Sequence, residues 1–144
     1  MLSHTIDKIS MQLVAAIITS LAALLTLPPS SFAEDQDMSV IARASAGPLA
    51  CEIRRVSAGA SVQLTGVVSG SAAVSGNARL LLTKSGPSGT SNVNQDNAFD
   101  LAAGAELHVS HVTINLQHGD HATVELVATS KDGLACRATA SLEL

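Results

Sequence analysis

The sequence predicts an all-β fold, a small immunoglobulin-like antiparallel β-sandwich of about seven strands. Two observations support this prediction. Short segments in which apolar and polar residues alternate recur at regular spacing from Leu49 to the C-terminus, as expected for half-buried strands. Turn-forming residues separate these segments, and the clearest case is Lys131-Asp132-Gly133, because Asp-Gly between two alternating segments is a typical hairpin signal.

The N-terminal segment has the features of a secretory signal peptide. A mostly apolar run, Leu13–Leu27, is followed by Ser31-Phe32-Ala33, a small-x-small ending that suits signal peptidase. The run is shorter than the roughly 20 residues that a membrane-spanning helix needs. We therefore expect residues 1–33 to be removed, and the mature protein to begin at Glu34 and to be exported.

The mature chain divides into a lead and one domain. Residues 34–47 are polar and rich in Ala and Ser, which predicts a flexible lead, with a weak helical turn over residues 38–44 as the alternative. The remaining stretch, residues 48–144, has the length of one small domain.

Seven strands are expected in this domain. The segment at residues 77–84 is taken as the central strand, because it is too short for a comfortable helix and has Gly close on both sides. In the fifth strand the apolar residues change phase, which predicts a β-bulge near Ser110-His111. The predicted strands span residues 49–55, 61–68, 77–84, 91–101, 107–116, 121–128 and 134–144.

The core is expected to be thin. The sequence contains no Trp, no Tyr and two Phe, and Phe32 leaves with the signal peptide. Cys51 and Cys136 fall on inward faces of the first and last predicted strands, and in an exported protein such a pair predicts a disulfide. Closing so long a loop stabilises by roughly 4–5 kcal/mol in the chain-entropy model.

Composition and motifs exclude several classes of function. The formal net charge is −4, which gives no reason to expect a nucleic-acid partner, because such a partner calls for a basic patch. No G-x-S-x-G, H-E-x-x-H or phosphate-binding Gly-rich motif occurs. We expect no enzyme activity, no cofactor, no membrane association after signal cleavage, and a monomer.

Four histidines suggest an alternative, a periplasmic β-sandwich that handles zinc or copper. Residues three apart in a regular strand point to opposite faces, which argues against a single site for them. They lie close together in the sequence, at His108, His111, His118 and His121.

Three arginines, Arg54, Arg79 and Arg137, fall on predicted outward faces. Charged outward positions can form a binding surface, or they can keep strand edges from aggregating. The residues alone leave both interpretations open. A structural, adhesin-like module is a further possibility.

A set of short motifs runs in order through the domain, from about Leu49 to Cys136. It comprises Ala50-Cys-Glu-Ile53, Val74-Ser-Gly76, Ser85-Gly86, Gly89-x-Ser91, Gln95, Phe99-Asp-Leu101-Ala-Ala-Gly104, Val112-x-Ile114-x-Leu116 and Asp132-Gly133-x-x-Cys136. In this order and spacing the set resembles the CsgH family of alphaproteobacteria.

The resemblance implies a small periplasmic immunoglobulin-like protein, functionally akin to CsgC. Such proteins hold curli amyloid subunits of the CsgA type back from polymerising, non-covalently and at substoichiometric amounts. The chain departs from the family at Ala78, where an aromatic is usual, and at Asp96-Asn97, where Gly-Gly is usual. The resemblance transfers no individual binding residue.

Overall fold

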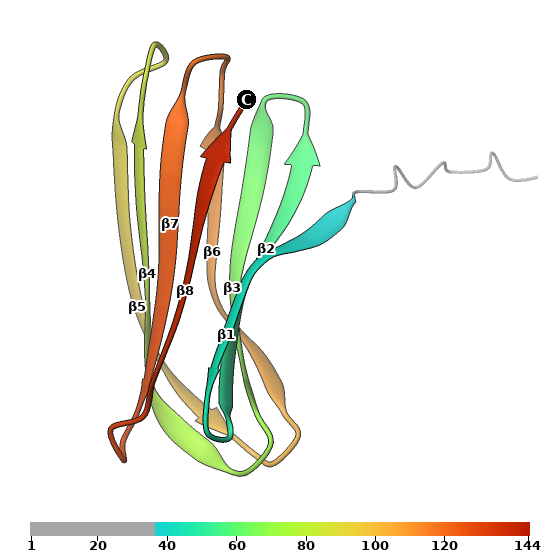
Figure 1. Ribbon diagram of the computed structural model, residues 1–144, viewed down its shortest axis with the longest axis vertical. Coiled ribbons are helices and arrows are strands. Elements are labelled where there is room, and N and C mark those ends of the chain that lie inside the picture. The colour runs from blue at the N-terminus through green and yellow to red at the C-terminus, as the bar shows by residue number, and fades with distance from the viewer. Residues whose placement is uncertain (1–36) are drawn as a thin grey trace, which may run out of the picture. The chain divides into compact units, whose positions relative to one another are not determined.

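The computed structural model describes residues 37–144, and the signal peptide expected over residues 1–33 lies outside them. In the described part of the chain, no helix is long and apolar enough to cross a membrane. The structure consists of strands joined by turns and short loops (Figure 1). The strands are β1 (Met38–Ala46), β2 (Leu49–Ala58), β3 (Ser61–Gly70), β4 (Val74–Ser85), β5 (Ser91–Leu101), β6 (Glu106–Asn115), β7 (His121–Ser130) and β8 (Ala135–Glu143).

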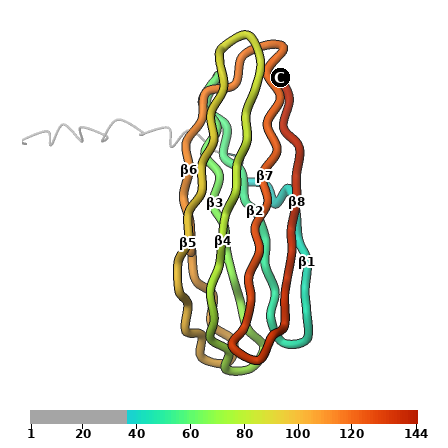
Figure 2. Tube along the Cα trace, turned by 90° about the vertical axis from the view of Figure 1, so that its left-hand side faces the viewer, coloured from blue at the N-terminus to red at the C-terminus, as the bar shows by residue number. Residues whose placement is uncertain are grey.

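The strands form two antiparallel sheets of four strands each, which confirms the predicted all-β antiparallel fold. Sheet A has the order β1-β2-β3-β6, and sheet B has the order β5-β4-β7-β8. The sheets pack face to face. Along one side β5 lies beside β6, and along the other side β1 lies beside β8 (Figure 2).

The prediction of a flexible lead over residues 34–47 is wrong for Met38–Ala46. These residues form β1, which raises the number of strands to eight. This segment pairs with β2, and Ala42 and Ala44 pack against the core. The Ala-rich composition that suggested flexibility therefore supplies small inward-facing residues. The chain then turns into β2 through Gly47, whose φ of 55° lies in the left-handed region that favours glycine.

A β-bulge interrupts the pairing of β3 with β6, close to its predicted position. Gly66 pairs with Ser110 and Val67 pairs with His108, so Val109 is the extra residue. Val109 and Ser110 are both buried although they are adjacent in sequence. The bulge thus explains why the apolar residues of this strand change phase.

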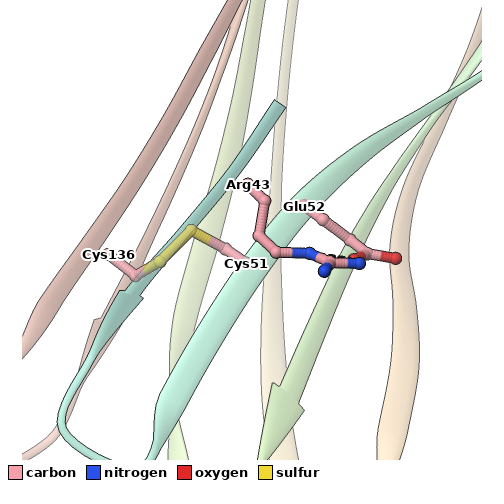
Figure 3. Close-up of a disulfide and its surroundings, with 4 residues drawn as sticks. All are labelled: Arg43, Cys51, Glu52 and Cys136. Carbon is pink, nitrogen blue, oxygen red and sulfur yellow. Dashed lines mark hydrogen bonds and ion pairs between the residues drawn. A yellow bond between two sulfur atoms is a disulfide. The ribbon is translucent and has the colours of Figure 1, made fainter. Parts of the chain in front are cut away.

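The predicted disulfide is confirmed. Cys51 of β2 and Cys136 of β8 are bonded, with a Cα–Cα distance of 6.1 Å. The bond links the two sheets through the core, and Figure 3 shows it close to Arg43 and Glu52. Around it the core is aliphatic, with Phe99 as its aromatic residue. Ala78 is buried within this core, as expected from its position on the central strand.

Candidate functional site

Two of the three predicted arginines share one surface. Arg79 of β4 and Arg137 of β8 are both in register with Val127 of β7, one on each side of it. Arg79, Arg137 and Val127 all lie on the outer face of sheet B. Arg54 lies in β2, on the outer face of sheet A, so the structure does not bring it to the other two.

A shallow groove of about 320 Å³ lies between these arginines. Its centre is apolar, because Leu81 is 36% exposed there and Val127 lies beside it. Charged side chains surround this centre. We call it the sheet-B groove, and its main side chains are Arg79, Leu81, Asp96, Glu125, Val127 and Arg137.

Each arginine of the sheet-B groove already has a carboxylate partner. Arg79 Nε lies 2.9 Å from Asp96 Oδ1, and Arg137 Nη1 lies 3.4 Å from Glu125 Oε2. The hydrogen bond with Asp96 raises the pKa of Arg79. The groove thus balances two positive and two negative charges. Exposed ion pairs of this kind contribute little to stability, so a partner's charged groups can replace them at low cost.

Arg54 belongs to a charged network across the outer face of sheet A. Arg43 contacts Glu52 at 2.9 Å, Glu52 contacts Arg54 at 2.5 Å, and Arg54 contacts Glu106 at 2.9 Å. The hydrogen bond from Arg54 lowers the pKa of Glu106. Val67 is in register with Glu52, and its exposure is 1% although it faces outward. The guanidinium of Arg54 is thus paired with two carboxylates, those of Glu52 and Glu106.

The structure does not gather the four histidines into one site. Within residues 37–144, no group of three or more His, Cys, Asp or Glu side chains is placed to hold a metal ion. His108 and His111 line a hollow beside β5 and β6, whereas the Nδ1 atom of His121 lies 2.9 Å from Oε1 of Glu143. His118 lies in the exposed turn that follows β6.

Sequence reasoning missed a polar contact that joins the two sheets along their β5–β6 side. The Gln95 side chain of β5 hydrogen-bonds both the C=O and the N–H of His111 in β6, at 3.1 and 3.2 Å. Asn97 Nδ2 donates to the C=O of Val109 at 2.6 Å. The available signal was alternation, because Gln95 and Asn97 share a face of β5 with Phe99 and therefore point inward.

A second missed feature is a buried ion pair at the end of the sandwich. Asp120 is fully buried and lies 3.6 Å from Lys84. Its carboxylate accepts hydrogen bonds from the backbone N–H and hydroxyl of Ser88 and from the N–H of Gln117. The Ser88 hydroxyl contributes most to lowering the pKa of Asp120 to about 2. Asp120 thereby ties the loop after β4 to the loop after β6.

Comparisons with known proteins point to one family. The family model described as CsgH protein matches residues 50–138. A solution structure of CsgH from R. palustris is 23% identical, with a TM-score of 0.51, and the match covers 66% of this chain and 91% of that one. The curli protein CsgC from E. coli is 15% identical, with a TM-score of 0.57, and coverage of 65% and 97%.

No curated protein matches the sequence. At these identities the two solved structures show a shared fold, and they transfer no site residue. The side chains described above are therefore judged on their own geometry.

Proposed function

The chain belongs to the CsgH family, whose model matches residues 50–138, and we propose that it is a periplasmic chaperone that delays polymerisation of the curli major subunit, of the CsgA type. The family match is the observation that carries this proposal. The structural similarity to CsgC, which is a curli protein of E. coli, supports the same biological setting.

The proposed mechanism is non-covalent binding. Amyloid subunits assemble by stacking strands in register, so their first nuclei and growing ends expose unpaired edges. These nuclei and ends are far fewer than the free subunits. A folded protein that binds them therefore acts at substoichiometric amounts, whereas a one-to-one binder of monomers requires matching concentrations.

We assign the contact surface to the sheet-B groove. Its apolar centre, Leu81 and Val127, offers a small area that a partner can cover. Its exposed pairs, Arg79–Asp96 and Arg137–Glu125, offer both signs of charge at the rim. Such complementarity mainly governs the rate and specificity of association, and salt screens it beyond about 8 Å at physiological ionic strength. Inhibition should therefore weaken as salt rises.

The test is dye-monitored fibrillation of a curli major subunit with the mature protein, residues 34–144, titrated in. We expect a longer lag time well below equimolar amounts, because nuclei and growing ends are far fewer than free subunits. The variant Arg137→Glu should weaken the delay, and the double variant with Arg79→Glu should weaken it further. Lys131→Glu is the matched control, because Lys131 is exposed in the β7–β8 turn and outside the groove.

An unchanged lag time with the wild-type protein would contradict the chaperone function. Equal loss in Lys131→Glu and Arg137→Glu would attribute the effect to net charge rather than to the groove. A full delay with the double arginine variant would keep the function and remove the contact surface from the sheet-B groove.

A further inference from the structure

Strand β6 has one side without a main-chain partner. It lies at the edge of sheet A, and within residues 37–144 it pairs with β3 alone. Alternate residues of a paired strand direct their N–H and C=O groups to opposite sides. His111 directs both groups away from β3, toward β5. Thr113 and Asn115 follow on the same side, so this side of β6 runs from Val109 to Asn115.

One side-chain amide takes the place of a missing strand at His111. Gln95 Nε2 donates to the His111 carbonyl, and the His111 N–H donates to Gln95 Oε1. Two residues of a hydrogen-bonded antiparallel pair exchange their bonds in this same double pattern. Asn97 adds a bond to the Val109 carbonyl. The backbone of β6 is thus already oriented as it would be beside a further strand.

This amide cover is removable. Gln95 is half-buried and Asn97 is exposed, so both amides can turn to water, where they regain hydrogen bonds, and little net stability is lost. A hollow of about 520 Å³ lies beside the cover, lined among others by Thr65, Asp96 and His111. It provides space next to the covered part of the strand.

We propose that the side of β6 from Val109 to Asn115 binds an extended segment of a partner polypeptide by strand addition, displacing the amides of Gln95 and Asn97. Main-chain hydrogen bonds carry this mode of binding, and it suits a partner whose own assembly proceeds by strand pairing. The identity of that partner as a curli subunit rests on the proposed function. Asp96 lines both this hollow and the sheet-B groove, so one bound chain can contact both.

The first test removes one N–H donor from the open side of β6 and places a proline ring where a partner strand would lie. Thr113→Pro deletes an N–H that points away from β3, and proline is tolerated on the open side of an edge strand. Thr113→Ala keeps the N–H and is the matched control. With the denatured curli major subunit as probe, about tenfold more Thr113→Pro than Thr113→Ala should be needed for the same lag time, if the lost bond and the ring cost about 1.4 kcal/mol.

The outcomes of this test separate the two proposals. If the wild-type protein delays fibrils and Thr113→Pro matches Thr113→Ala, strand addition at β6 is overturned while the chaperone function stands. If the wild-type protein causes no delay, the proposed function itself fails. Thermal melting of both variants verifies that they are folded.

A second measurement applies whatever the behaviour of the proline variant. Amide hydrogen exchange of the wild-type protein with the subunit should show slower exchange at Thr113, and unchanged exchange there would overturn the proposal. The double variant Gln95→Ala/Asn97→Ala uncovers the strand and should inhibit at lower concentration than the wild-type protein. A dimer of this variant that Thr113→Pro abolishes, without stronger inhibition, would assign the site to a second copy of the chain instead.

Discussion

Loss of the disulfide is expected to remove a large share of the stability of this domain. Cys51 and Cys136 are separated by 85 residues in sequence. In the chain-entropy model, closing a loop of that length stabilises the folded state by about 4.6 kcal/mol at 25 °C, because it restricts the unfolded chain. Small domains have a total stability of about 5–15 kcal/mol. An aliphatic core with Phe99 as its aromatic residue provides little additional stability to offset that loss.

The magnitude converts into a melting temperature. Unfolding entropy is about 2.1 cal/mol/K per residue near 60 °C, or about 0.23 kcal/mol/K for the residues that the structure describes. A loss of 4.6 kcal/mol then lowers the Tm by about 20 °C. The reduced protein, and the variant Cys51→Ala/Cys136→Ala, should both show this shift. The variant also loses two buried sulfur atoms, so its loss should equal or exceed that of the reduced protein.

The assay is urea unfolding of the wild-type protein and of the double alanine variant, each with and without reductant. The reductant should have no effect on the double alanine variant. This variant therefore controls for any effect of the reductant that does not act through the disulfide. The dependence of unfolding free energy on urea should be steeper without the bridge, because the unfolded chain exposes more surface. A loss below about 1 kcal/mol would refute the argument that the bridge compensates for a thin core.

Three further predictions concern other parts of the molecule. Within residues 37–144 the buried Oγ atom of Ser110 has no hydrogen-bond partner, so Ser110→Ala should raise the free energy of unfolding by about 1 kcal/mol in urea titrations. A decrease would mean that the hydroxyl has a partner. Gly66→Ala should lower the free energy of unfolding by about 1–3 kcal/mol, because an added Cβ would lie 2.3 Å from Ser110 Oγ and 3.1 Å from Leu126 Cδ1. An unchanged urea midpoint would show that this contact relaxes. The pKa of Asp120 is lowered from 3.8 to about 2 in the folded state, so its contribution to stability is fully present above about pH 4 and is lost as the pH falls toward 2. Asp120→Asn should therefore reduce the change of the urea midpoint between pH 5 and pH 2, whereas the exposed control Asp132→Asn should not. Equal pH profiles for the two variants would contradict this.

Stoichiometric zinc or copper should leave the melting temperature unchanged, because the histidines of the described chain are not gathered around one point. A ligand present at 100 times its dissociation constant would stabilise by about 2.7 kcal/mol. An upward shift of that size would favour the metal-handling alternative.

The sequence was informative wherever burial imposes a period of two. The ranges of β2 to β8 were close to those observed, and even the bulge near Ser110 was visible as a change of phase. Alternation also placed Cys51 and Cys136 inward and Arg79 and Arg137 outward. These predictions depend on local geometry, because successive side chains of any strand point to opposite faces.

The sequence was uninformative where an interaction depends on which strands become neighbours. Strand β1 was missed because Ala and Ser are typical of flexible leads, and its order comes from pairing with β2 rather than from its own composition. The carboxylate partners of Arg79 and Arg137 come from β5 and β7. Gln95 reaches β6 from the opposite sheet. Alternation within one segment indicates which face a side chain takes, as for Gln95, but it does not indicate the partner on another strand.

The four edge strands explain how this β-rich protein avoids joining the assembly that we propose it restrains. Exposed strand edges invite pairing with other chains, and natural proteins protect them with charges, bulges or covering groups. Strand β5 carries Asp96, β8 carries Arg137 and β1 has an irregularity between Val40 and Ala42, so these edges resist a regular partner strand. The edge of β6 has a bulge at Val109 as well, and the removable amides of Gln95 and Asn97 cover it in addition. A permanently open edge would template aggregation and a permanently closed one would bind nothing. A cover that a competing strand can displace meets both requirements, and this is the role that we propose for the edge of β6.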